Sequence, residues 1–194
     1  MTTTLAESIQ KNLGYPELRK IDPNTQTVKQ KNEEEVPNQL GQAAIPTVLL
    51  GLYKYGNTEK GSEDILRGNI STAWLDLFFG DVKQEAISKV AAYAGKQNEE
   101  VAPKMEEIAS EAVKIIRENT PEKASFGDVK SYVANQRNSI LVFLPAELQI
   151  STLMNDSTLD DRTNKMEGPV SSVVHFVEKL FSGSTTEKNE APEE

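Results

Sequence analysis

The sequence predicts an all-α fold, organised as a compact multihelical bundle with polar loops and a disordered C-terminal tail. Apolar residues recur every three or four positions in one segment after another, as they do along the buried face of an α-helix. No segment shows the alternation of apolar and polar residues that a half-buried strand requires. The nearest candidate for a strand, Ser139 to Phe143, is better explained as part of a helix.

A short helix opens the predicted bundle. Thr4 and Glu7 have the spacing of a capping box, in which each side chain accepts a hydrogen bond from the backbone of the other residue. Leu5, Ile9 and Leu13 then recur on one face of the chain. The cap and the apolar face together predict one short helix over these residues.

A polar linker precedes the most hydrophobic part of the chain. Residues 22–38 are polar and contain the acidic run Glu33-Glu34-Glu35, so we predict a surface linker there. Residues 39–55 carry apolar side chains on more than one side of a helix, which is typical of a buried helix. We expect this helix at the centre of the bundle, either kinked or interrupted at Pro46.

Four further helices are predicted between residues 62 and 118. Glycines mark the ends of the first three, and an aspartate offers a side-chain cap for the third. The last helix has the clearest pattern, because its apolar residues form one stripe with acidic residues opposite. The predicted helices are Ser62 to Arg67, Thr72 to Phe79, a helix capped by Asp81 and closed by Gly95, and Asn98 to Glu118.

The last third of the chain is predicted to continue the bundle and then to leave it. Ser125 and Asp128 give a second capping pattern, before a helix that ends ahead of Pro145, and a short helix follows from Pro145 to Leu153. The predicted parts of the chain are a multihelical domain at 1–154 that contains the 22–38 linker, a polar loop at 155–168, an amphipathic helix at 169–182 and a disordered acidic tail at 183–194.

The charge and composition argue against several classes of function. A formal net charge of -9 disfavours nucleic acid as a partner, because binding a phosphate backbone relies on clustered Lys and Arg. The absence of cysteine excludes disulfides and thiolate metal sites and fits a reducing compartment. The longest apolar run, residues 45–55, is too short for a membrane span, and no secretory signal is visible. We therefore expect a cytoplasmic protein.

The central part of the chain has a distinctive spacing of alanine, leucine, glycine and proline. The runs that carry it are Leu40-Gly41-Gln42-Ala43-Ala44-Ile45-Pro46-Thr47-Val48-Leu49-Leu50-Gly51-Leu52, Val90-Ala91-Ala92-Tyr93-Ala94-Gly95 and Val101-Ala102-Pro103. In these runs the chain resembles the bacterial YidB-like family, multihelical cytoplasmic proteins of unknown function. The chain departs from that family by having less glycine there and a longer C-terminal part. The resemblance implies a helical fold and supplies neither an activity nor catalytic residues to assign to this chain.

No pattern of residues predicts catalysis, a cofactor or a metal site. The only histidine, His175, is expected opposite the apolar stripe of its helix, where it is either an exposed surface residue or a weak pH-sensitive contact. The common nucleotide-binding and hydrolase motifs do not occur. The acids of the 98–118 helix are expected to face solvent rather than to share a metal ion; they are Glu99, Glu100, Glu106, Glu107 and Glu111.

Gln136 is the one candidate for a buried polar residue. It falls inside the apolar face defined by Val133 and Ile140, and a buried amide needs hydrogen-bond partners. Two interpretations stay open at this point. The amide either ties down the backbone of a neighbouring segment or faces a ligand cavity.

Two functions of different classes fit these observations. The first is a non-enzymatic protein that contacts a protein partner or itself through the 169–182 helix, which either packs on its own domain or inserts into a partner's groove. The second is a carrier of a small apolar ligand or lipid, with a cavity between residues 39–55 and 128–144. An enzyme would need a cleft in which acids converge with perturbed pKa values. The predicted contact residues are Val170, Val173, Val174, Val177, Leu180 and Phe181.

Overall fold

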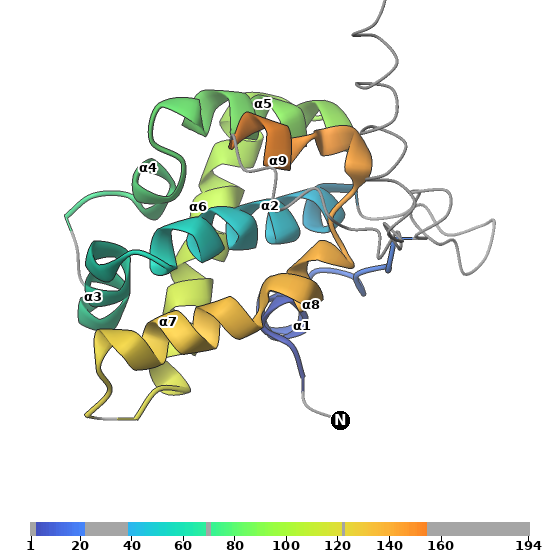
Figure 1. The fold of residues 1–194 in the computed structure, drawn as a ribbon. Coiled ribbons are helices and arrows are strands. Elements are labelled where there is room, and N and C mark those ends of the chain that lie inside the picture. Colours follow the sequence, from blue (N-terminus) through green and yellow to red (C-terminus); the bar gives the residue numbers. More distant parts are fainter. Residues whose placement is uncertain (1–2, 22–38, 69–70, 122, 155–194) are drawn as a thin grey trace, which may run out of the picture. The chain divides into compact units, whose positions relative to one another are not determined.

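The computed structural model describes residues 3–21, 39–68, 71–121 and 123–154, and these residues form an all-α bundle without strands (Figure 1). The predicted linker at 22–38 and everything predicted from residue 155 onward lie outside the described residues. The elements are α1 (Leu5–Asn12), α2 (Gln39–Gly56), α3 (Glu59–Arg67), α4 (Trp74–Phe79), the 3-10 turn η1 (Gly80–Val82), α5 (Lys83–Ala94), α6 (Asn98–Glu118), α7 (Phe126–Asn135), α8 (Arg137–Leu141), the 3-10 turn η2 (Ala146–Leu148) and α9 (Ile150–Leu153).

Helix α2 lies at the centre of the bundle, as the sequence predicts. It runs between α5 and α7 in Figure 1, α6 crosses it, and α1, α3, α4 and α8 also pack against it. Every residue from Gly41 to Leu52 is buried, and Pro46 lies inside the continuous helix without interrupting it. Each fully buried Leu, Ile or Val contributes roughly 1.5–3 kcal/mol. The all-round apolar surface of α2 therefore supplies much of the core.

Local signals in the sequence fix the ends of several helices. Helix α6 has the predicted bounds. At the start of α1, the Thr4 hydroxyl accepts a hydrogen bond from the Glu7 N–H, and the Glu7 carboxylate accepts one from the Thr4 N–H at 2.9 Å. Ser125 and Asp128 form the second predicted capping box, at the start of α7. Caps of this kind need only residues three apart, so the sequence alone reveals them.

Three predicted helix starts are wrong. Helix α3 begins earlier than predicted, because the Thr58 hydroxyl accepts a hydrogen bond from the Gly61 N–H at 2.9 Å and so caps the helix there. Helix α4 begins later, at Trp74. Asp81 does not cap α5, since it lies within η1 and α5 starts after that turn without a side-chain cap.

The region after α6 is more broken than the sequence predicts. The expected helix from Ser125 to Leu144 is divided at Gln136, where the Ser139 hydroxyl donates to the Gln136 carbonyl at 2.7 Å. Polar side chains that bond to nearby backbone compete with a regular helix. The short helix expected after Pro145 is likewise divided, because Gln149 has a positive φ of 47° between η2 and α9.

Candidate functional site

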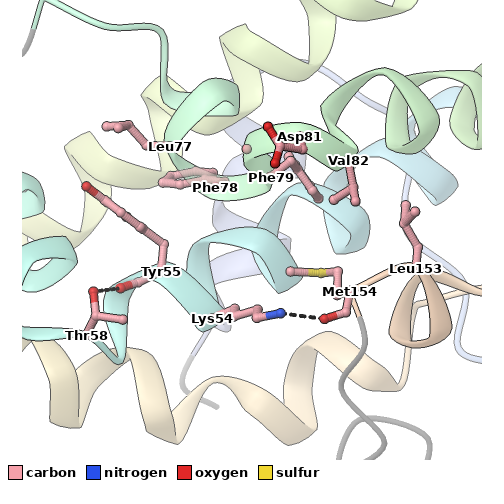
Figure 2. Close-up of a pocket in the computed structure, with 11 residues that line it drawn as sticks. Lys54, Tyr55, Thr58, Leu77, Phe78, Phe79, Asp81, Val82, Leu153 and Met154 are labelled. Carbon is pink, nitrogen blue, oxygen red and sulfur yellow. Dashed lines mark hydrogen bonds between the residues drawn. The ribbon is translucent and has the colours of Figure 1, made fainter.

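An open apolar groove lies beside the C-terminal end of α2 (Figure 2). Residues of α2 form one wall, the segment from α4 to η1 forms the opposite wall, and the end of α9 adds a third side. The groove has a volume of about 470 Å³. We name it the α4 groove, and its apolar lining consists of Leu77, Phe78, Phe79, Val82, Leu153 and Met154.

A carboxylate from another helix holds α4 in place. No side chain at its own N-terminus caps α4. Instead, the Glu106 carboxylate on α6 accepts hydrogen bonds from the backbone N–H groups of Trp74, at 2.7 Å, and Leu75, at 3.0 Å. A negative charge at this position also interacts favourably with the positive end of the helix dipole. One wall of the groove is therefore anchored to α6.

Helix α4 packs closely on α2 next to the groove. A Cβ added at Gly51 would lie 2.8 Å from Phe79 Cζ and 3.1 Å from Phe78 Cβ, so the missing side chain allows this close approach. The Phe78 ring also packs between two other rings, with its centroid 5.8 Å from that of Tyr55 and 5.7 Å from that of Trp74. The aromatic side chains of α4 are thus part of the core.

The edges of the groove carry partly exposed apolar side chains. Leu77, Val82 and Leu153 are half-buried, whereas Met154 is buried. The Lys54 ammonium donates a hydrogen bond to the Met154 carbonyl, which ties the end of α9 to α2 (Figure 2). Apolar surface that stays in contact with water is stabilised when a second apolar surface covers it.

Tyr55 belongs to a charged cluster beside the groove. The Asp64 carboxylate on α3 accepts hydrogen bonds from the Tyr55 hydroxyl and the Lys60 ammonium, both at 2.5 Å. The hydrogen bond from Lys60, followed by that from Tyr55, lowers the pKa of Asp64. Burial and the bond to Asp64 raise the pKa of Tyr55, and the bond to Asp64 raises the pKa of Lys60.

These pKa shifts do not prepare the cluster for proton transfer. They keep the Asp64 carboxylate ionised, the Lys60 ammonium protonated and the Tyr55 hydroxyl neutral at neutral pH. A general base or nucleophile needs a pKa moved toward neutrality instead. The cluster is therefore suited to joining α2 to α3. In the part of the chain that the structure describes, no three acidic or histidine side chains are grouped so that they could hold a metal ion.

The structure places Gln136 between α7 and α8, where it is half-buried and does not line the α4 groove. Its side-chain oxygen accepts a hydrogen bond from the Leu5 N–H, at the start of α1, at 3.4 Å. The amide thus contacts the backbone of a neighbouring segment. The α4 groove also lies elsewhere than the cavity of the carrier hypothesis, since α4 and α9 border it rather than residues 128–144.

The expectation that the acids of α6 all face solvent is wrong for two of the five. Glu106 is half-buried because it caps α4. Glu111 is also half-buried, and its carboxylate accepts a hydrogen bond from the Asn12 side chain at 2.8 Å. Both contacts join α6 to helices that lie far away in the sequence. The exposed acids are Glu99, Glu100 and Glu107.

Sequence reasoning missed the lining of the groove. The six predicted contact residues between Val170 and Phe181, like His175, lie outside the described residues. Leu77 and Val82 carried no distinct signal. The one available hint was the run Trp74 to Phe79, which is apolar at all but one position in a helix too short to bury every side chain.

Two further observations assign no class of function to the chain: a search of its helices for membrane spans and comparisons with known proteins. None of the helices in the described residues has the length and apolar character that crossing a bilayer requires. We find no match between the chain and any protein-family model, curated protein or solved structure. The resemblance to the YidB-like family therefore stays a prediction.

Proposed function

We propose that this chain is a non-enzymatic protein that acts through protein–protein contact, and that the α4 groove receives the apolar side chains of an amphipathic helix from a protein. The observation that carries the proposal is the open groove itself, with buried aromatic rings in one wall and half-buried Leu77, Val82 and Leu153 at its edges. Grooves with this lining are a common acceptor for the apolar face of a helix.

Two features favour a helix as the occupant. The described residues contain no strand, so no sheet edge is present there to which an extended peptide could add by backbone hydrogen bonds. A helix satisfies its own backbone groups and needs only apolar surface from the groove.

The charged cluster supports a binding role over an enzymatic one. Its acid, Asp64, bonds to the groove residue Tyr55 and has a lowered pKa, and the pKa shifts in the cluster stabilise resting charge states. Catalysis by carboxylate, lysine or tyrosine would need several such groups directed into one water-poor cleft. The α4 groove is lined mainly by side chains without titratable groups.

A photo-cross-linking amino acid at Leu77 tests the proposed function in the full chain. We expect cross-linking to a polypeptide, with the attached residues mapping by mass spectrometry to the apolar face of a helical segment. Gln84, which is exposed on α5, is the matched control position and should give little of that product. If position 77 yields no polypeptide product beyond that from position 84, the proposal is wrong.

A carrier of a small apolar ligand is the second candidate. The volume of about 470 Å³ favours it, since ligand pockets commonly measure roughly 300–1,000 Å³. The open side of the groove disfavours it, because such pockets usually bury most of the ligand surface. Native mass spectrometry of the purified chain separates the two, since a carrier retains a ligand mass that the Leu77→Glu variant loses.

A further inference from the structure

The proposed function does not specify which helix occupies the α4 groove, and the chain itself contains a suitable one. Apart from the stripes that the described helices bury, the sequence holds one further long apolar stripe, in the predicted helix at 169–182. The remaining segments outside the described residues contain few apolar side chains. Resting on the proposed function, we propose that the α4 groove receives the 169–182 helix of a second copy of this chain.

The chemistry of the stripe matches the groove. The stripe presents branched aliphatic side chains and ends in Leu180 and Phe181, and the groove offers aromatic rings, leucines and a methionine. Methionine side chains adapt to partners of different shape. The polar side of the predicted helix, with Ser171 and Ser172, would remain in water.

The length and exit point of the chain allow exchange between two copies. The described chain ends at Met154, which itself lines the groove. Residues 155–168, which separate Met154 from the predicted helix, span up to roughly 50 Å when extended. A small domain is roughly 30 Å across, so this reach allows the helix of each copy to enter the groove of the other.

Reciprocal exchange gives a closed assembly. When each copy donates one helix and accepts one, both grooves are filled and a two-fold dimer results, with no free site for further growth. One short helix in a groove buries a small area, so each contact alone is weak. Two contacts therefore hold the dimer more tightly than one contact does, and the dimer dissociates on dilution.

A complementation experiment on the purified full-length chain tests this inference. The Leu77→Glu variant has a defective groove and an intact helix. The double variant Val174→Glu and Val177→Glu has an intact groove and a defective helix. Light scattering after gel filtration should show that the wild-type chain is a dimer and that each variant alone is a monomer. An equimolar mixture of the two variants should form heterodimers. These heterodimers should be weaker than the wild-type dimer, because only one of the two contacts remains.

Two controls separate this result from misfolding and from charge effects. The double variant Ser171→Glu and Ser172→Glu adds the same charge to the opposite side of the predicted helix and should dimerise as wild type does. Circular dichroism and the urea midpoint of the Leu77→Glu variant should show a folded chain. If that variant is unfolded, the milder Leu77→Ser variant takes its place in the mixture.

Three outcomes would overturn the inference. These are a wild-type chain that is monomeric at every concentration, variants that dimerise like wild type, and a mixture that remains monomeric. A cross-link from position 77 to a different protein, together with a monomeric wild-type chain, would exclude self-association but support the proposed protein-contact function. A small molecule that stays bound in native mass spectrometry would contradict both the self-association and the protein-contact function.

Discussion

The two ends of helix α2 are built differently. Near its N-terminal end, the buried Gln42 side chain accepts a hydrogen bond from the Arg19 N–H at 2.8 Å and donates to the carbonyls of Arg19, at 2.9 Å, and Phe143, at 2.7 Å. Near its C-terminal end, the apolar lining of the α4 groove meets α2, while Lys54 donates a hydrogen bond to the Met154 carbonyl and Tyr55 donates one to Asp64.

This difference separates a fixed region from an adaptable one. Hydrogen bonds are directional, so the three made by Gln42 set the positions of two chain segments that are distant in sequence. Apolar contacts are not directional and depend mainly on the area covered. The open apolar lining of the groove can therefore be covered by a new apolar partner while the bonds from Tyr55 to Asp64 and from Lys54 to Met154 remain, whereas the segments at the other end are held by the bonds of Gln42.

The largest expected effect comes from removing the amide at the fixed end. The Gln42→Ala substitution deletes three hydrogen bonds and leaves buried backbone groups without these partners, which should lower the free energy of unfolding by about 3 kcal/mol. Urea denaturation, monitored by circular dichroism, measures this change in the free energy of unfolding. Gln84→Ala, at an exposed position, is the control and should change little; equal effects for the two variants would contradict this account.

A smaller effect is expected where α6 holds the wall of the groove. Glu106→Ala removes the cap of α4 and should cost about 1–2 kcal/mol, with faster hydrogen exchange at the amides of Trp74 and Leu75. Glu106→Gln keeps one carbonyl acceptor, so its free energy of unfolding should lie between those of the wild type and Glu106→Ala. Glu107→Ala is the adjacent control, because Glu107 is exposed and forms an ion pair with Lys104 on its own helix. Unchanged exchange in Glu106→Ala would show that α4 does not depend on this cap.

The smallest effect is expected from the charged cluster and depends on pH. The lowered pKa of Asp64 means that its stabilising effect is present above the pKa of an unfolded aspartate, about 4, and is lost as the pH falls through the lower pKa of the folded chain. Because the Lys60 side chain is 72% exposed, solvent screens the pair and the effect should be the smallest of the three.

The Asp64→Asn substitution measures this contribution. The difference in urea midpoint between the wild type and Asp64→Asn should be largest near neutral pH and should shrink as the pH falls into the acidic range. Asp81→Asn is the control, because the Asp81 carboxylate is exposed and makes no hydrogen bond or ion pair with the described residues. A difference that grows on acidification would have the wrong sign for the cluster described above.

The sequence predicted those parts of the fold that depend on neighbouring residues. The bounds of α6 and both capping boxes follow from side chains three or four positions apart. The central burial of α2 follows from its composition, since a helix that is apolar on several sides has to be surrounded. In the capping boxes and in α6, the residues that interact or share a face lie within or next to one helix. The burial of α2 does not depend on which helices cover it.

The contacts that shape the candidate site could not be predicted in this way. Glu106 caps a helix that begins at Trp74, and Gln42 bonds to Phe143, so each pair is distant in the sequence. The acidic face of α6 gave no sign that one of its members reaches another helix. The groove likewise arises from how closely α4 approaches α2 at Gly51, a tertiary property that periodicity does not encode.

Methyl NMR spectra of the purified full chain over a range of concentrations test the central claim directly. If the α4 groove is the surface through which copies of this chain meet, dilution should shift the methyl resonances of Leu77, Val82 and Leu153. The resonances of Leu5 and Ile9, which are buried in α1, should stay unchanged. Spectra that do not change on dilution, or changes centred on α1 instead of the groove, would contradict the account.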